Sequence, residues 1–238
     1  MSALPLFRAK TLMKRFGGFV ALDNVNLTVR AGERVGLIGP NGSGKSTLVN
    51  CASGVLRNYG GAVWFKDRCL DRLPPNERVR AGLVRSFQLP RPFRGLTVAE
   101  NLRVPFVFAG RRTKDDAAID EALDFVGLSV RRTAMPQDLN QIDLRKLDLA
   151  RAIVAAPELL FVDEVMAGLS HSEVDEVLAL LMRLNESGVA IVMIEHIMRA
   201  VTAFSQRLVV LVAGRKIAEG DPDDVLANLE VQRAYLGE

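Results

Sequence analysis

The chain has 238 residues, of which 49% are hydrophobic and 25% are charged, as in an ordinary globular protein with a sizeable core. Its 31 basic and 28 acidic residues leave a net charge of +3, too even a balance to favour nucleic acid as a partner. No apolar run approaches the roughly eighteen residues that a membrane-spanning helix needs, and "MSALPLFRAK" lacks the apolar core of a secretory signal. We therefore expect a soluble protein that binds no nucleic acid and meets a membrane only through a partner.

The first clear element along the chain is "RVGLIG" at residues 34–39, an apolar run that leads into a glycine-rich turn and a helix from Lys45. Further strand-like segments follow at 62–66, 83–88, 158–164, 189–195 and 207–214. The last three are apolar enough to be buried on both faces, as strands of a parallel sheet are. Between two of them, "SEVDEVLALLMRLNESG" predicts an amphipathic helix that stops at Gly188. This alternation predicts a doubly wound α/β fold.

The stretch from the prolines of "LPRPFRG" onwards reads as helical. Thr97 with Glu100 three positions later forms a capping box that opens one helix. A second helix is expected in "KDDAAIDEALDFVGL", ending near Gly127, and a third begins around Asn140. The expected organisation is a single domain, 1–238, with an α/β core at 1–88 and 157–238 and an inserted helical subdomain at 89–156.

The strongest motif is "GPNGSGKST", which matches G-x-x-x-x-G-K-[ST] in full and lies between a strand and a helix. Its residues are Gly39, Pro40, Asn41, Gly42, Ser43, Gly44, Lys45, Ser46 and Thr47. The glycines let backbone N–H groups converge on phosphate oxygens, and the helix N-terminus adds the positive end of its dipole. We expect Lys45 to neutralise the β- and γ-phosphates and Ser46 to bind Mg²⁺.

The second motif is "LLFVDE", in which four apolar strand residues deliver Asp163 and Glu164 to the carboxyl end of a strand. Ligands bind at that end of the strands in open α/β sheets. Asp163 is placed to hold Mg²⁺ through its water shell, and Glu164 to orient or deprotonate an attacking water. Two acids after a strand are common by themselves, and the pairing with the phosphate loop is what gives them weight.

With these motifs in place, the chain resembles the nucleotide-binding subunits of ABC transporters over nearly its whole length, which implies the P-loop NTPase fold of ABC ATPases with a β-rich N-terminal part, ATP and Mg²⁺ as cofactors, and ATPase activity. Gln88, after "LVRSF", matches the family's Q-loop glutamine, which touches the metal and the attacking water. His196, in "MIEHIM", matches the switch histidine at the γ-phosphate, so the resemblance implies a catalytic trio with Glu164. Phe16, in "KRFGG", matches the aromatic residue that stacks on adenine, although Phe19 is close.

The family's Leu-Ser-Gly-Gly-Gln signature, which contacts the partner subunit's nucleotide, is altered here. Its positions are occupied by Leu139, Asn140, Gln141, Ile142 and Asp143. Asn140 can cap a helix or offer its amide to a phosphate, but not fully both, and the side chains of Gln141 and Ile142 replace glycines. We therefore expect the chain to work best in a heterodimer with a second ATPase subunit that has an intact signature.

Within the family, "KRFGGFVALDNVNLTV", "IEH" and the ending "IAEGDPDDVLANLEVQRAYLGE" look most like the ATPase subunits of branched-chain amino acid importers. That likeness implies two membrane-spanning permease subunits, a substrate-binding protein outside the cytoplasm that acts through them, and a peripheral location on the cytoplasmic face of the inner membrane. Importers of urea or short amides share much of the pattern, and a catalytically weak or regulatory subunit is the other alternative. A DNA-repair relative would need a long coiled coil, and a translation-linked one two phosphate loops; the sequence has neither.

Overall fold

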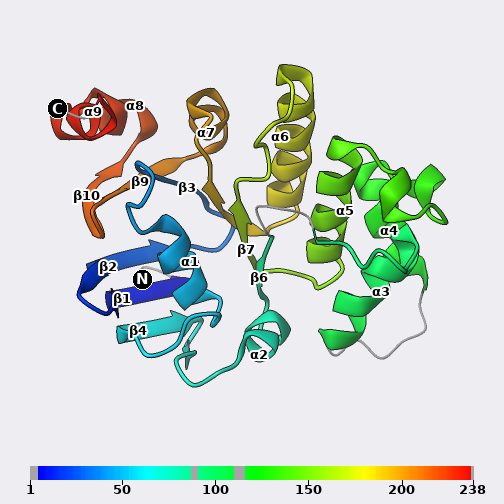
Figure 1. Cartoon of the computed structure of the whole chain (residues 1–238), viewed down its shortest axis with the longest axis horizontal. Helices are drawn as coiled ribbons and strands as arrows, with labels where there is room; N and C mark the ends of the chain where they lie inside the picture. Colours follow the sequence, from blue (N-terminus) through cyan, green and yellow to red (C-terminus); the bar gives the residue numbers. More distant parts are fainter. Residues whose placement is uncertain (1–4, 87–90, 110–115, 237–238) are drawn as a thin grey trace.

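The larger of two sheets carries the phosphate loop. The computed structural model describes residues 5–86, 91–109 and 116–236. Six strands follow the order β10-β9-β3-β8-β7-β6, and all neighbours are parallel except β9 and β10 (Figure 1). They are β3 (Arg34–Ile38), β6 (Leu83–Arg85), β7 (Leu159–Asp163), β8 (Ala190–Ile194), β9 (Arg207–Val212) and β10 (Arg215–Gly220). Because β3 and β7 run in the same direction, their carboxyl ends lie at one edge of the sheet.

A smaller antiparallel sheet forms the β-rich N-terminal part, with the order β2-β1-β4-β5. Its strands are β1 (Phe7–Phe16), β2 (Phe19–Val29), β4 (Gly60–Phe65) and β5 (Arg68–Cys69). The strand expected at 62–66 therefore belongs to this sheet and begins two residues earlier. The two long strands β1 and β2 pair along their whole length, from Phe7 with Val29 to Phe16 with Phe19 at the hairpin turn.

The helices cover the two faces of the large sheet and extend to one side of it (Figure 1). They are α1 (Lys45–Ala52), α2 (Pro75–Arg80), α3 (Val98–Phe108), α4 (Asp116–Val126), α5 (Gln141–Ile153), α6 (His171–Glu186), α7 (Met198–Phe204), α8 (Pro222–Ala227) and α9 (Leu229–Leu236). Short 3₁₀ turns lie at Ser129–Arg131 and Pro136–Asp138. None of the helices in the described part of the chain is long and apolar enough to cross a membrane.

Alternation along the strands divides the apolar side chains between two cores. In β7, Leu159 and Phe161 pack with α1 and the antiparallel sheet. Leu160 and Val162 face the opposite side, in a core that also contains side chains of α3 to α7. A period of two is what a pleated strand requires, so every strand buried on both faces must be apolar throughout. This explains why the sequence predicted these strands well.

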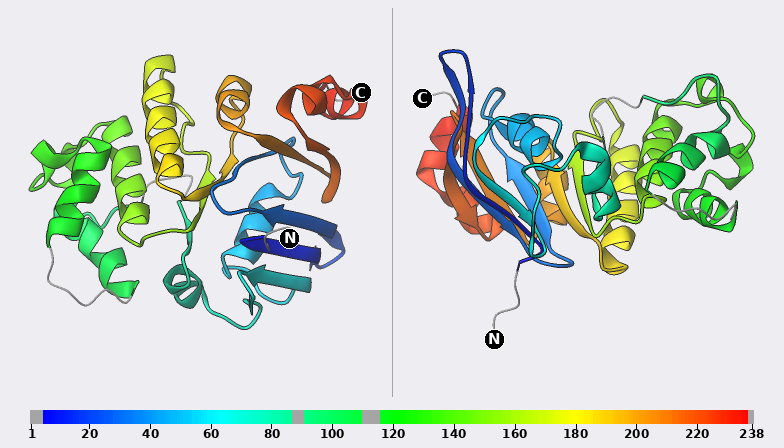
Figure 2. Two further views of the ribbon diagram at one scale, coloured as in Figure 1. Left: turned by 180° about the vertical axis from the view of Figure 1, so that it is seen from behind. Right: turned by 90° about the horizontal axis from the view of Figure 1, so that it is seen from below.

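The expected helices are present at the expected places. The Thr97 hydroxyl accepts a hydrogen bond from the backbone N–H of Glu100, and the Glu100 carboxylate accepts one from the backbone N–H of Thr97, so the capping box of α3 is confirmed. The helix expected to end near Gly127 is α4, and the one expected around Asn140 is α5, which starts one residue later. Figure 2 shows α3, α4 and α5 at the opposite end of the molecule from the antiparallel sheet. The strand predicted at 83–88 is described only as far as Ser86.

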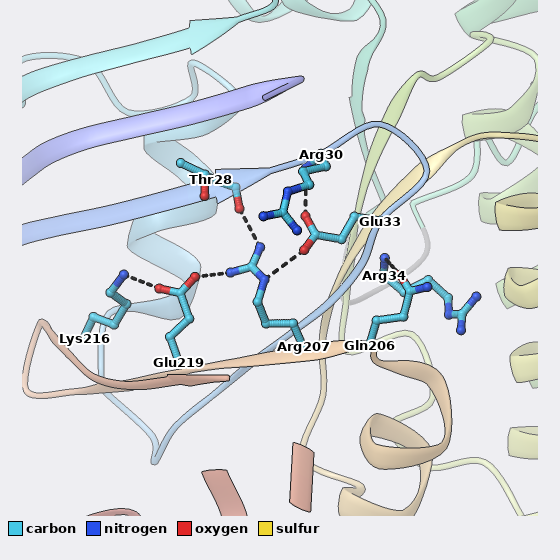
Figure 3. Close-up of polar contacts among 8 residues, drawn as sticks. All are labelled: Thr28, Arg30, Glu33, Arg34, Gln206, Arg207, Lys216 and Glu219. Atoms are coloured by element: carbon cyan, nitrogen blue, oxygen red, sulfur yellow. Dashed lines mark hydrogen bonds and ion pairs between the residues drawn. The ribbon is translucent and has the colours of Figure 1, made fainter. Parts of the chain in front are cut away.

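A polar network ties β9 and β10 to the start of β3, at the end of that strand opposite the phosphate loop (Figure 3). The Arg207 guanidinium donates to Glu33 Oε1 over 2.8 Å, to the backbone oxygen of Thr28 over 2.7 Å, and to Glu219. Glu33 also accepts from the backbone N–H of Arg30 over 2.7 Å. These contacts join the residues just before β3 to the β9–β10 hairpin, which is far away in the sequence.

Glu33 makes this network sensitive to acid. Burial alone would raise the pKa of Glu33, but the hydrogen bonds from Arg207 and the Arg30 N–H, with the charges of both arginines, lower it below its ordinary value. A lowered pKa in the folded state means that Glu33 stabilises the fold above its unfolded-state pKa and ceases to do so as pH falls through its folded-state pKa. We expect Glu33→Gln to lower the free energy of unfolding at pH 7 by about 1.5–3 kcal/mol. In denaturant titrations, the difference from the unsubstituted chain should shrink as pH falls below the ordinary carboxyl pKa; a difference that persists in acid would contradict this.

Candidate functional site

The glycine-rich loop between β3 and α1 requires glycine at both ends. Gly39 has φ 149°, and a Cβ there would lie 2.0 Å from the backbone oxygen of Leu211 in β9. Gly44, which precedes α1, has φ 105°, and a Cβ there would lie 2.6 Å from the backbone oxygen of Ala21. Neither distance is possible for a real Cβ, so the loop is pressed against two neighbouring strands. This close packing holds the loop in a shape that ligand binding does not have to create.

Lys45 lies folded over this loop. Its side chain is only 5% exposed, and its ammonium donates to the backbone oxygens of Gly39 over 2.7 Å and Pro40 over 3.0 Å. Burial lowers the pKa of Lys45, and the negative charges of Glu164 and Asp163 oppose that change. An ammonium has three donors, so one remains to face an anion in the loop. The hydroxyl of Ser43 is also buried there and makes no hydrogen bond within the described residues, as a group reserved for a ligand would.

A pocket of about 220 Å³ extends from this loop toward the β1–β2 hairpin. Asn41, Gly42, Ser43, Gly44, Lys45, Ser46 and Thr47 line it on one side, and Phe16, Phe19, Ala21 and Glu164 on the others. Phe16 and Phe19 are paired across the hairpin turn and are 47% and 62% exposed. An exposed aromatic pair beside a phosphate loop suits a planar ring, and the ammonium of Lys14 lies 5.3 Å from the Phe16 ring. The two phenylalanines thus offer two surfaces for one base.

Asp163 ends β7 and is held by a residue that the sequence analysis missed. Its Oδ2 lies 2.6 Å from Nη2 of Arg85, and Arg85 also donates to the side chain of Asn50 in α1. The backbone N–H of Asp163 donates to Ser86 Oγ over 3.3 Å. Because β6 and β7 are neighbouring parallel strands, the last residue of β6 lies beside the acidic pair. The sequence shows a basic residue, Arg85, near the end of a predicted strand. It does not show that this strand lies beside the one that ends in Asp163, and the ion pair depends on that strand order.

Glu164 and His196 are brought together although 32 positions separate them. Glu164 Oε1 lies 2.8 Å from His196 Nε2, and the backbone N–H of Glu164 donates to the backbone oxygen of Ile194 over 2.8 Å. Glu164 has φ 48°, a left-handed conformation that is uncommon for a residue with a side chain. The site therefore contains a carboxylate in hydrogen-bond contact with an imidazole, beside the phosphate loop. Gln88, the third residue expected here, lies outside the described residues.

The altered signature segment opens α5. The Oδ1 of Asn140 accepts from the backbone N–H of Asp143 over 2.8 Å, so this side chain caps the helix. Leu139 and Ile142 are buried in their own chain, while Asn140 and Gln141 are exposed. Of the two side chains that stand in place of the signature glycines, Gln141 is exposed and Ile142 is buried, so only Gln141 adds a side chain to the surface. Its Nε2 lies 3.4 Å from the backbone oxygen of Ala167.

The site fits a triphosphate with Mg²⁺ better than it fits a metal bound by protein alone. In the described ranges, no three side chains of His, Cys, Asp or Glu gather into a metal-binding group. The hydroxyl of Ser46 and the carboxylate of Asp163 are hard oxygen donors, which suit an ion that keeps most of its ligands as water and phosphate. The buried ammonium, the buried hydroxyl and the close-packed glycines together fit a chain of phosphates.

Comparison with known proteins agrees with this geometry. The family model described as "ABC transporter" matches residues 22–167, and a model described as "Branched-chain amino acid ATP-binding cassette transporter" matches residues 215–238. The chain is 39% identical to the high-affinity branched-chain amino acid transport ATP-binding protein LivG of Salmonella typhimurium, over 98% of both proteins.

Solved structures give the same result. An ATP-binding cassette of an ABC transporter in its ADP conformation superposes with a TM-score of 0.88 at 30% identity, covering 99% of this chain and 100% of that one. A second cassette, dimeric and bound to ADP and Pi in a post-hydrolysis state, superposes with a TM-score of 0.82 at 25% identity, covering 91% of this chain and 98% of that one. From its sequence, its fold and its phosphate loop, the chain belongs to the ABC transporter family and is one of its ATP-binding subunits.

Proposed function

We propose that this chain hydrolyses ATP to power an importer of branched-chain amino acids. The observation that carries the ATPase role is the Glu164–His196 pair at 2.8 Å beside the phosphate loop. The observation that carries the choice of cargo is the likeness to LivG, which extends over 98% of the chain and includes its C-terminal segment. Cargo is read by other subunits of such a transporter, so the ATPase contributes motion rather than selectivity.

Each part of the site has a role in this proposal. The phosphate loop from Gly39 to Thr47 binds the triphosphate through its backbone N–H groups, and Lys45 places its charge on the β- and γ-phosphates. Ser46, Asp163 and Gln88 would hold Mg²⁺, which would supply charge neutralisation on the triphosphate. Glu164 orients the attacking water and accepts its proton, and His196 steadies the Glu164 carboxylate through the 2.8 Å contact.

The proposed assembly is a pair of ATPase subunits that cover the open pocket beside the phosphate loop. Two ATPase subunits close over two ATP molecules, and closure excludes water from the reaction. The helical block at 89–156 forms the subdomain that meets the cytoplasmic loops of two permease subunits. A binding protein on the other side of the membrane delivers the amino acid. The chain then lies at the cytoplasmic face of the inner membrane without entering it.

The function is tested by assembling the chain in lipid vesicles with a second ATPase subunit, two permease subunits and a binding protein from the same organism. Leucine, isoleucine or valine should stimulate ATP hydrolysis and enter the vesicles. Stimulation by urea or a short amide alone would overturn the choice of cargo. An assembly that transports with this chain's site inactivated would instead mean that the chain is a regulatory subunit.

The choice between Phe16 and Phe19 as the adenine contact gives a separate prediction. Stacking of a base on an aromatic side chain contributes about 1–3 kcal/mol, so its loss should weaken ATP binding roughly tenfold or more. We expect that loss for Phe16→Ala and a smaller one for Phe19→Ala, because Phe16 is the last residue of β1, which Lys14 anchors to the backbone oxygens of Arg57 and Asn58. Equilibrium binding of a fluorescent ATP analogue measures both. A larger loss for Phe19→Ala would assign the contact to the other ring.

The capped Asn140 predicts asymmetry between the two ATP sites of the dimer. Its Oδ1 accepts from the Asp143 N–H, which fixes the direction of the Nδ2–H₂ donors; where that direction prevents one charge-assisted hydrogen bond to a phosphate, the cost is about 1.5–3 kcal/mol. The site that combines this chain's Lys45 and Glu164 with a partner's intact signature should therefore be the stronger one. Replacing the catalytic glutamate in this chain should reduce transport more than the same change in the partner. Equal losses, or brisk ATP turnover by this chain alone, would contradict the asymmetry.

A further inference from the structure

A buried carboxylate beside the site has no part in the mechanism above. Glu195 follows β8, directly precedes His196, and is 2% exposed. Its Oε1 accepts a hydrogen bond from the backbone N–H of Met166 over 2.8 Å. Burying a carboxylate is costly unless hydrogen bonds and charges compensate. Glu195 lies between the segment that carries Glu164 and the residue His196, so its buried carboxylate can hold these two parts of the site together.

The segment from Glu164 to Leu169 is joined to the end of β8 at three points. The backbone N–H of Glu164 donates to Ile194, the N–H of Met166 donates to Glu195, and the Glu164 carboxylate contacts His196. The three acceptors or partners are consecutive residues. Glu195 supplies the middle contact, and it is the one contact of the three made by a buried side chain. The other two of these polar contacts both involve Glu164 itself.

The charge of Glu195 is compensated only in part. Burial raises the pKa of Glu195 above its ordinary value, and hydrogen bonds from the backbone N–H groups of Met166 and His196 offset part of that rise. Arg145 of α5 interacts electrostatically with Glu195 and donates to the backbone oxygen of Ala167 over 3.1 Å. The carboxylate and the guanidinium therefore hold two successive residues of the same segment, one through its N–H and the other through its carbonyl.

Glu164 needs such support because of its backbone. Its left-handed conformation, with φ 48°, costs free energy and persists only where the surrounding structure imposes it. A carboxylate that is to orient a water must also be held to within a fraction of an ångström. Met166, two residues later, is fully buried. A hydrogen bond at its backbone N–H therefore restrains the chain on the C-terminal side of Glu164.

We propose that Glu195 is a positioning residue, which holds the Met166 N–H so that the Glu164 carboxylate stays aligned with the attacking water and with His196. This inference rests on the proposed role of Glu164 as the base. Glu195 is not among the residues that line the pocket beside the phosphate loop. Its loss should therefore affect the rate of hydrolysis and leave ATP binding to the phosphate loop intact.

The test compares Glu195→Leu with Glu195→Gln in the full-length chain, assembled with its transporter partners. Leucine keeps much of the volume but cannot accept the Met166 N–H, whereas the amide oxygen of glutamine can. Because a misplacement of about 1 Å can cost roughly a hundredfold in rate, we expect Glu195→Leu to reduce kcat at least about tenfold. The KM for ATP should stay within about twofold. Glu195→Gln should restore most of kcat.

Glu33→Ala is the matched control, because Glu33 is also largely buried and paired with an arginine but lies at the opposite end of β3. It should lower Tm by an amount comparable to Glu195→Leu and leave kcat unchanged. An unchanged kcat in Glu195→Leu overturns the inference. So does a kcat in Glu33→Ala that falls as far as that of Glu195→Leu, or a kcat in Glu195→Gln that is no higher than that of Glu195→Leu. If Glu164→Gln loses turnover while Glu195→Leu keeps it, only this inference fails. If both keep it, the proposed function of Glu164 fails as well.

Discussion

Lys45→Ala should abolish ATP binding by the chain and turnover in the assembled transporter. The ammonium is 5% exposed and lies over the loop, where it donates to the backbone oxygens of Gly39 and Pro40. The one remaining donor can make a charge-assisted hydrogen bond to phosphate that contributes about 1.5–3 kcal/mol, so its loss alone weakens ATP binding roughly ten- to a hundredfold. The substitution also removes a buried positive charge that faces Glu164 and Asp163, which leaves those two carboxylates to repel the triphosphate.

The measurement is equilibrium binding of MgATP, followed by the rate of phosphate release. Lys66→Ala is the control, since Lys66 is an exposed lysine paired with Glu158 at the other end of the molecule's central strands. It changes the net charge equally and should bind ATP normally. A Lys45→Ala variant with undiminished affinity and turnover would remove the phosphate loop from the proposed mechanism.

Glu164→Gln should separate binding from hydrolysis. The amide keeps the size of the side chain and can still meet His196, which lies 2.8 Å from Oε1. It cannot accept the proton of an attacking water, and general-base catalysis is typically responsible for about 10²–10⁴ of an enzyme's rate. We therefore expect ATP to bind with unchanged or higher apparent affinity, turnover to fall by at least about a hundredfold, and the closed dimer with bound ATP to accumulate.

Size-exclusion chromatography with MgATP detects the closed dimer, and single-turnover kinetics give the rate. Glu158→Gln provides the control, because Glu158 precedes the same strand, β7, at its amino end and pairs with exposed Lys66. Its turnover should match that of the unsubstituted chain. Normal turnover in Glu164→Gln would mean that another group activates the water.

Local patterns in the sequence determined much of this protein. The phosphate loop could be recognised because its nine residues are contiguous and their spacing is imposed by the ligand. The strands of the large sheet could be placed because a strand buried on both faces must be an apolar run, and β3, β7, β8 and β9 are themselves largely apolar runs. The Thr97–Glu100 capping box and the start of α5 were also predictable, because a helix cap depends on side chains within four positions of one another.

Contacts between distant segments were decided only by the tertiary structure. Arg85 reaches Asp163 because β6 happens to lie beside β7, and Glu195 reaches Met166 because β8 lies on the other side of β7. Nothing in the spacing of these residues reveals strand order, since neighbouring strands of a parallel sheet need not be consecutive in the chain. Sequence patterns identify groups that a ligand or a helix selects locally, whereas the partners that hold those groups in place follow from the order and register of strands.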